Sequence, residues 1–147
     1  MAKCIFLLDK SGSMESVLKD TIGGFNSFVR SQVHLDGTLS LYTFSDTCKC
    51  EYRNVPIGDV KPLTEETYIP GGSTAFYDAM GQVLTENEPF DTNSTLVVLT
   101  DGQENSSRKY TKSHIKDLIR FSPQLNVIYV GVDIDDASEL GIQHTME

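Results

Sequence analysis

Oxygen-bearing side chains stand at three separated points of the sequence. Asp9, Ser11 and Ser13 follow the first apolar run of the chain. Thr74 comes after a pair of glycines, and Asp101 follows a later apolar run. Carboxylate and hydroxyl oxygens are the ligands that hard divalent cations such as Mg²⁺ prefer. If the fold brings these side chains together, the chemistry that they support is the binding of such an ion.

The balance of charges in this set favours Mg²⁺. Asp9 and Asp101 supply two negative charges, which one divalent cation neutralises, and the hydroxyl groups add none. Mg²⁺ takes six oxygen ligands and keeps waters or accepts an outside anion when the protein provides few carboxylates. We therefore expect an Asp or Glu side chain of a protein partner to complete the shell. Mn²⁺ accepts the same oxygens and is the alternative ion.

Short apolar runs and helix-like segments alternate along the chain. The runs are rich in β-branched and aromatic residues, as strands are; they are Cys4–Leu8, Thr38–Phe44, Cys48–Tyr52, Leu96–Thr100 and Val127–Val132. Helical spacing predicts helices over 14–32, 75–86 and 112–120. This alternation predicts a doubly wound α/β domain with a mostly parallel sheet and helices on both faces. The short polar join at 45–47 predicts a hairpin, so 48–52 is expected to be an antiparallel edge strand.

The predicted elements place the oxygen donors at one edge of the sheet. Ligands of open α/β sheets bind outside the carboxyl ends of the strands, which is where Asp9 and Asp101 fall. The long loop 53–73 precedes Thr74, and loops of that length are commonly functional. Local explanations stay open for single residues, since Ser13 is also a suitable helix N-cap and Asp101-Gly102 a suitable turn.

Length and composition exclude several classes of protein. A chain of 147 residues predicts one domain spanning 1–147. With 12 Lys+Arg against 21 Asp+Glu, the net charge of −9 argues against nucleic acid and membrane surfaces as partners. No apolar run reaches the ~20 residues of a membrane span, and no signal peptide fits before Cys4. Three cysteines without zinc-ligand spacing favour a reducing compartment, so we expect a cytoplasmic protein.

The same residues resemble a known family. Asp9-Lys10-Ser11-Gly12-Ser13 matches the Asp-x-Ser-x-Ser motif of von Willebrand factor A-like (vWA) domains. Thr74, within Gly-Gly-Ser-Thr-Ala-Phe-Tyr-Asp, resembles their loop threonine, and Asp101 resembles their loop aspartate. Together they are similar to a complete metal-ion-dependent adhesion site (MIDAS). The chain further resembles small stand-alone vWA proteins of bacteria and phages over the segments 21–26, 63–68 and 101–107.

The resemblance implies a Rossmann-like fold, no catalysis and a site made of five residues. It implies that serine and threonine hydroxyls bind the metal directly, that aspartates bind it directly or through water, and that a partner carboxylate often completes the shell. The residues that match are Asp9, Ser11, Ser13, Thr74 and Asp101.

Two neighbouring positions have open roles. Ser73 is the alternative to Thr74, although the register of Thr74-Ala-Phe-Tyr-Asp78 fits the family better. Asp78 either orients a loop hydroxyl or water as a hydrogen-bond acceptor, or is an ordinary acidic residue in the first turn of a helix.

The C-terminal part of the chain departs from the family pattern. Many vWA domains have a further strand and a final helix, and only 137–140 and 142–146 remain here to form them. Because that helix moves in vWA domains that switch affinity, we expect no long-range switching in this chain. We also expect one edge of the sheet to be open to a partner.

Two other functions compete with metal-dependent binding. In a phosphoryl-transfer enzyme, Asp9 would be the nucleophile, but Ser11 stands where such enzymes place a second acid. The strand at 127–132 is followed by aspartates where such enzymes need a lysine, and no phosphate-binding or nucleophile-elbow motif occurs. A structural subunit of a phage or another assembly, with a metal that stabilises the loops, is the second alternative. The motif does not separate it from regulated binding, and it leaves the oligomeric state open.

Overall fold

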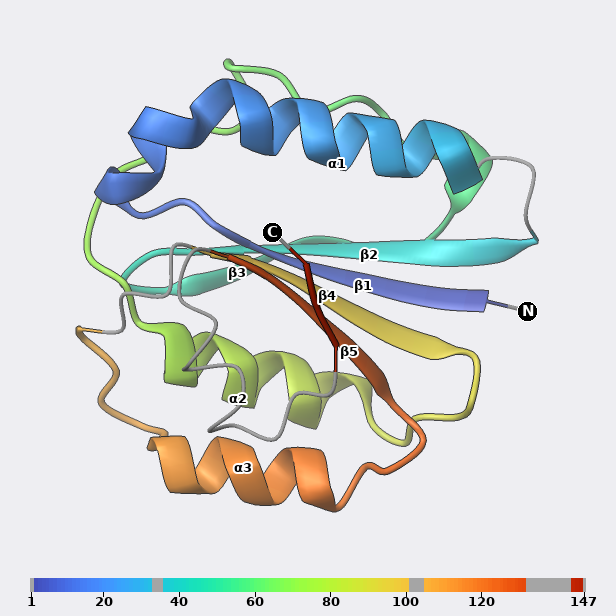
Figure 1. The fold of residues 1–147 in the computed structure, drawn as a ribbon, viewed down its shortest axis with the longest axis vertical. Helices are drawn as coiled ribbons and strands as arrows, with labels where there is room; N and C mark the ends of the chain where they lie inside the picture. The colour runs from blue at the N-terminus through green and yellow to red at the C-terminus, as the bar shows by residue number, and fades with distance from the viewer. Residues whose placement is uncertain (1, 33–35, 101–104, 132–143, 147) are drawn as a thin grey trace.

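The computed structural model describes residues 2–32, 36–100, 105–131 and 144–146. Its strands form one sheet in the order β3-β2-β1-β4-β5-β6 (Figure 1). Neighbouring strands are parallel except for the pair of β2 and β3. The expected mostly parallel sheet with one antiparallel edge strand is thus confirmed. The strands are β1 Ala2–Asp9, β2 Gly37–Phe44, β3 Cys48–Pro56, β4 Ser94–Thr100, β5 Asn126–Gly131 and β6 His144–Met146.

Helices cover both faces of the sheet, as the sequence predicts. Helix α1, Leu18–Gln32, lies over one face, and α2, Phe76–Asn87, and α3, Lys112–Arg120, lie over the other (Figure 1). The helix expected from residue 14 begins instead as a 3₁₀ helix, η1, over Gly12–Val17. The Met14 N–H donates to the Ser11 carbonyl at 3.0 Å, so the chain is wound more tightly here than in an α-helix. A second 3₁₀ turn, η2, spans Ile57–Asp59.

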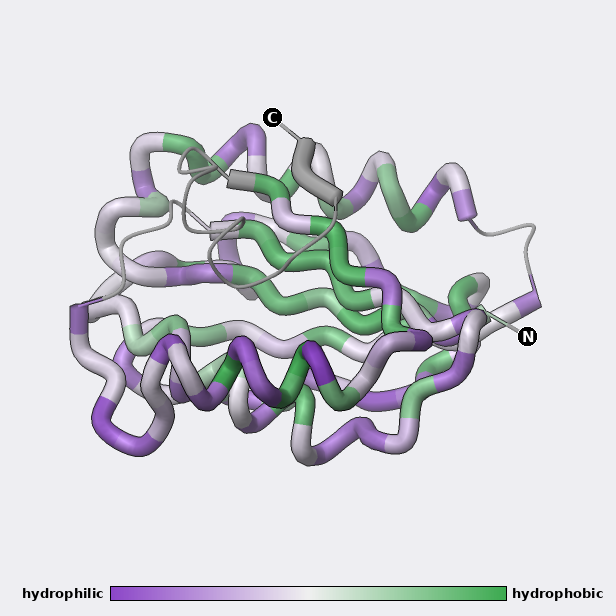
Figure 2. Tube along the Cα trace, turned by 60° about the horizontal axis from the view of Figure 1, so that its bottom comes forward, coloured by the Kyte–Doolittle hydropathy of each residue, from purple (hydrophilic) through white to green (hydrophobic). Residues whose placement is uncertain are grey.

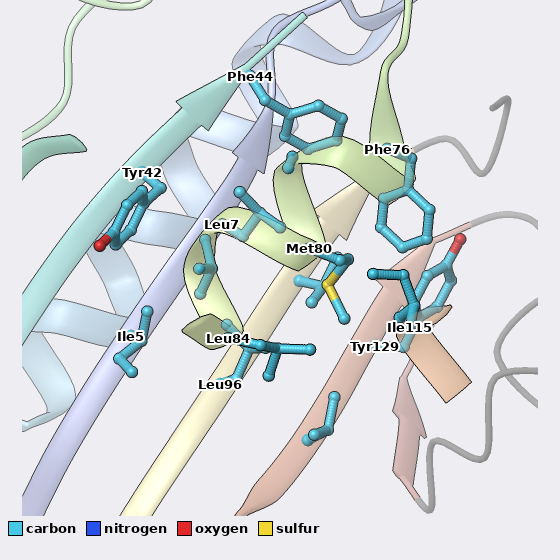
Figure 3. Packing of buried hydrophobic residues seen from close by; sticks show 14 of the residues in the cluster. Ile5, Leu7, Tyr42, Phe44, Phe76, Met80, Leu84, Leu96, Ile115 and Tyr129 are labelled. Carbon is cyan, nitrogen blue, oxygen red and sulfur yellow. The ribbon is translucent and has the colours of Figure 1, made fainter. Parts of the chain in front are cut away.

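The sheet separates two hydrophobic clusters. Because successive side chains of a strand point to opposite faces, Ile5 and Leu7 of β1 pack toward α2, while Phe6 and Leu8 pack toward α1. Figure 3 shows the α2 side, where Met80 lies over the strands. Figure 2 shows hydrophobic residues along the strands and alternating polar and hydrophobic residues along the helices. Strand β1 is therefore buried on both faces, as is typical of a central parallel strand.

The two edges of the sheet differ from the sequence prediction in detail. Strand β3 runs to Pro56, beyond the expected end at Tyr52. Its pairing with β2 shifts register near Leu41, and Asn54, at φ 53°, donates its N–H to the Ser40 hydroxyl at 2.9 Å. This irregularity breaks the alternation that marks a strand in sequence.

At the other edge, strand β6 pairs in parallel with β5. The sequence left 142–146 as a possible last strand. Within this segment, His144–Met146 forms β6 and covers the edge of β5. In the described ranges, each helix is too short or too polar to cross a lipid bilayer.

Candidate metal centre

Asp9 is the last residue of β1, and its side chain is 0% exposed. Strand β1 lies between β2 and β4, so Asp9 stands at the middle of the carboxyl edge of the sheet. Its Oδ1 accepts the Ser11 N–H at 2.7 Å, and its Oδ2 accepts the Thr100 hydroxyl at 2.7 Å. These two donors fix the plane of a buried carboxylate, and each oxygen has further capacity to accept.

The hydroxyls of Ser11 and Ser13, in the loop that follows Asp9, are hydrogen-bonded to each other. Their Oγ atoms are 3.2 Å apart. Two oxygens on adjacent corners of an Mg²⁺ octahedron with ligand distances of about 2.1 Å are about 3.0 Å apart, so this pair fits one ion. Ser13 lies inside η1, whose N-cap residue is Ser11 and which has no side-chain capping bond. The structure therefore does not give Ser13 the N-cap role that the sequence left open.

The loop that carries Thr74 is joined to the Asp9 loop by main-chain hydrogen bonds. Gly71 N–H donates to the Lys10 carbonyl at 2.8 Å, and Gly12 N–H donates to the Gly72 carbonyl at 3.0 Å. Gly72 has φ +87°, and a Cβ there would collide with the Asp46 carboxylate. Glycine suits this position because a φ in the left-handed region is strained for residues that carry a side chain.

Thr74 and Ser73 are held in different ways. Thr74 is 2% exposed, and its main chain forms two hydrogen bonds with Asn105. The Thr74 N–H donates to Asn105 Oδ1 at 2.9 Å, and the Thr74 carbonyl accepts the Asn105 N–H at 2.9 Å. The Ser73 hydroxyl donates to that of Ser106 at 2.9 Å. Ser73 is thus engaged with the neighbouring loop, and Thr74 stays the predicted ligand.

Tyr68 supports the site in a way that the sequence did not reveal. Its side chain is 1% exposed, and its hydroxyl donates to the main-chain carbonyl of Asp9. The start of its loop is fixed by Asn26, whose amide accepts the Leu63 N–H at 2.8 Å and donates to the Leu63 carbonyl at 2.9 Å. An aromatic residue in a long loop was the only available signal, because a main-chain acceptor leaves no mark in sequence.

The carboxylate of Asp78 accepts hydrogen bonds from main-chain N–H groups. Its carboxylate accepts the N–H groups of Arg108 at 2.9 Å, Lys109 at 2.9 Å and Tyr110 at 2.8 Å. Burial raises the pKa of Asp78, but these three donors outweigh burial, and the net shift is downward. Asp78 is the acidic residue in the first turn of α2 that the second expectation describes, and from there it holds the loop after β4 against that turn.

The remaining predicted ligand, Asp101, follows Thr100 and lies outside the described residues. Among the residues that are described, no three His, Cys, Asp or Glu side chains gather in one place. The donors that the structure does bring to this edge are a buried carboxylate and hydroxyls. This set suits a hard divalent cation and does not suit a soft thiolate or imidazole site.

No protein-family model and no characterised protein sequence matches the chain. Solved structures do match over most of its length. Manganese-loaded TRAP protein of Plasmodium vivax aligns with a TM-score of 0.69 at 15% identity, over 97% of this chain and 63% of that one. Proximal thread matrix protein 1 of the mussel byssus aligns with a TM-score of 0.66 at 18% identity, over 99% and 41%.

A second structure of the mussel protein is described as having a zinc-occupied MIDAS motif; it aligns with a TM-score of 0.65 at 19% identity, over 95% and 38%. The chain thus spans less than two thirds of the length of both proteins. A von Willebrand factor type A protein of Catenulispora acidiphila aligns with a TM-score of 0.64 over 99% of the chain. The element order, the strand directions and these alignments agree: the chain has a von Willebrand factor A-like fold.

Proposed function

We propose that this protein is a non-enzymatic binding module that captures an acidic side chain of a protein partner through a divalent metal ion. The observation that carries the proposal is the 3.2 Å approach of the Ser11 and Ser13 hydroxyls beside the buried carboxylate of Asp9. Two neutral oxygens at that spacing suit adjacent corners of an octahedral ion. Mg²⁺ is the proposed ion, and Mn²⁺ is its substitute.

In this proposal the hydroxyls of Ser11, Ser13 and Thr74 bind the ion, and the aspartates Asp9 and Asp101 bind it directly or through water. The bound ion supplies an electrophilic position for an incoming carboxylate. The chain's own residues hold that position open: they contribute few charges, so the ion keeps its affinity for an anion. Solved structures of similar fold that contain manganese or a zinc-occupied MIDAS support a divalent ion.

The arrangement at Asp9 supports binding more than catalysis. A phosphoryl-transfer enzyme would place a second acid at position 11, and Ser11 is there instead, with its N–H on Asp9 Oδ1. The Asp9 carboxylate accepts bonds at both oxygens from Ser11 and Thr100. A carboxylate oriented by two such bonds suits a fixed role at a metal site.

Metal binding is tested by thermal unfolding of the full chain with Mg²⁺, with Mn²⁺ and with EDTA. An ion at a hundredfold excess over its Kd stabilises the fold by about 2.7 kcal/mol. Thr74→Ala is expected to lose most of this stabilisation, because it removes a ligand. Ser73→Ala is the matched control and should keep it, since the Ser73 hydroxyl binds Ser106. A wild-type Tm that is the same with Mg²⁺, with Mn²⁺ and with EDTA would overturn the proposal.

Carboxylate capture is tested separately with a capped pentapeptide, Gly-Gly-Asp-Gly-Gly, and its Asn counterpart. Two-dimensional NMR of the wild type detects even weak binding. We expect the Asp peptide to shift resonances around Ser11 and Thr74 only when Mg²⁺ is present, and the Asn peptide to shift none. Equal responses to both peptides, or a response to Asp that persists in EDTA, would contradict the role of the metal.

A further inference from the structure

One large hydrophobic side chain lies exposed beside the proposed metal site. Ile69 is 68% exposed, and the other large hydrophobic residue that is exposed in the described part of the chain is Phe121, at 80%. Phe121 follows α3 and precedes β5, which places it at the opposite, amino edge of the parallel sheet (Figure 1). A single exposed hydrophobic residue is ordinary on a protein surface, so what distinguishes Ile69 is the place at which its loop is held.

Two hydrogen bonds hold Ile69 next to residues 9–13, which carry Asp9, Ser11 and Ser13 and are called the metal loop below. The residue before it, Tyr68, donates its hydroxyl to the Asp9 carbonyl. Two residues after it, Gly71 N–H donates to the Lys10 carbonyl at 2.8 Å. Only Ile69 and Pro70 lie between Tyr68 and Gly71, which are hydrogen-bonded to the consecutive residues Asp9 and Lys10. This short span fixes the backbone of Ile69 in place, although the side chain is open to solvent.

A fixed apolar side chain is a favourable contact for a partner, because little conformational freedom is lost when it is covered. The loop that carries Ile69 also bears the exposed acids Glu65 and Glu66, and Asp46 is exposed close to Gly72. These acids disfavour further acidic residues of a partner at this rim. The surface thus suits one carboxylate on the metal with apolar neighbours, rather than an acidic cluster.

We propose that the partner segment packs an apolar side chain on Ile69 while its Asp or Glu side chain binds the metal. This inference rests on the proposed function, which by itself would admit any exposed acidic side chain. Ile69 would favour partner segments in which a large aliphatic residue lies near the acidic residue over segments that have the acidic residue alone.

The test uses the full chain with saturating Mg²⁺ and five capped peptides. The parent is Gly-Gly-Asp-Gly-Gly, and in each of the other four a Leu replaces one of the glycines. Affinities come from two-dimensional NMR titrations. We expect at least one Leu peptide to bind about tenfold more tightly than the parent, as burial of an aliphatic side chain predicts. That gain should vanish in Ile69→Ser and persist in Phe121→Ser, while the Kd for Mg²⁺ stays the same in both variants.

The outcomes separate the two proposals. If the parent peptide binds with Mg²⁺ but no Leu peptide binds more tightly, or if Ile69→Ser keeps the gain, the role of Ile69 is wrong and metal-dependent binding stands. If neither the parent nor any Leu peptide binds, carboxylate capture is itself wrong, and the role of Ile69 falls with it. Because Ile69 is exposed, Ile69→Ser is expected to fold, which its Tm verifies.

Discussion

At the scale of single residues, Asp9 is held at both its side chain and its main chain. Its carboxylate accepts from Ser11 and Thr100, and its carbonyl accepts from Tyr68. A ligand that is oriented before the ion arrives loses less freedom on binding, so these bonds favour metal affinity. The three donors come from the residue before η1, from β4 and from the loop between η2 and α2, so three parts of the chain hold Asp9.

We predict that Tyr68→Phe weakens both the fold and the metal site. The change removes the donor to a buried carbonyl, and leaving such a group without its bond costs about 1–3 kcal/mol of unfolding free energy. Because that carbonyl belongs to Asp9, the Kd for Mg²⁺ should rise as well. Urea unfolding measures the first effect, and calorimetric titration with Mg²⁺ measures the second.

Tyr52→Phe is the matched control for this change. The Tyr52 hydroxyl is buried and has no hydrogen-bond partner among the described residues. Burial first, and the charge of Glu51 second, raise the pKa of Tyr52 to about 12. Removal of this hydroxyl should leave stability unchanged or slightly higher, with no effect on Mg²⁺ affinity. Equal losses in both variants would show that Tyr68 acts only as a packed ring.

The sequence predicts where the ligand candidates lie in the fold, but it does not predict the residues that support them. Asp9, Ser11 and Ser13 were placed correctly at the strand edge because their spacing after an apolar run is local information. Tyr68 and Asn105 were not identified as supports, because their partners are main-chain atoms of residues far along the chain. Asp101 stays a prediction.

At the scale of elements, Asp78 fastens the loop after β4 to the beginning of α2. Three consecutive N–H groups, from Arg108 to Tyr110, point at its carboxylate, and the Ser107 hydroxyl accepts the Asp78 N–H at 3.0 Å. The same loop binds Thr74 through Asn105. Asp78 thus steadies a loop that in turn positions a predicted metal ligand.

Asp78→Asn is expected to destabilise the protein by about 1–3 kcal/mol near pH 7, because hydrogen bonds to a charged acceptor are lost. The pKa of Asp78 is lowered below its ordinary value of 3.8 in the folded protein. The stability that it contributes is therefore fully present above that value and is lost as the pH falls through the folded pKa. The difference between wild type and variant should shrink when urea unfolding is repeated below pH 4.

Asp117→Asn provides the comparison for this experiment. Asp117 is exposed and lies 3.8 Å from Arg120 on the surface of α3, a type of ion pair that contributes little. Its removal should change stability by less than about 0.5 kcal/mol. An Asp78→Asn variant that behaved like this control would contradict the proposed fastening role.

The elements themselves were largely predictable from the sequence. Helix α3 matches its predicted bounds, because a clear amphipathic pattern ends at a proline. Strand β3 was predicted too short, since its irregular pairing near Asn54 interrupts the alternation. The 3₁₀ start of the first helix depends on a tight turn at Ser11, which apolar periodicity does not encode.

At the scale of the whole molecule, the charge of −9 opposes the kind of partner that the site would capture. One divalent ion removes only two of those charges. The remaining field repels an approaching carboxylate, although at physiological salt it extends only about 8 Å. A partner with basic residues beside its acidic one would meet less repulsion.

We predict that a capped Gly-Lys-Asp-Lys-Gly peptide binds the Mg²⁺-loaded protein more tightly than Gly-Gly-Asp-Gly-Gly. The advantage should be several-fold at low ionic strength and should nearly disappear at 0.5 M salt, because screening shortens the range of the field. NMR titrations at the two salt concentrations measure both effects. The Asn analogue of the lysine peptide controls for attraction without metal contact, and a salt-independent advantage would contradict the prediction.

The bonds between the metal loops have a consequence for how this domain can diversify. Gly71 with Lys10, and Gly12 with Gly72, are joined through main-chain atoms. Such bonds do not depend on the identity of the side chains that project from the rim. Randomising Ile69 in a library would therefore yield modules that share one ion and one scaffold but address different targets. The same separation would let natural relatives change partners by substitution at a single exposed position.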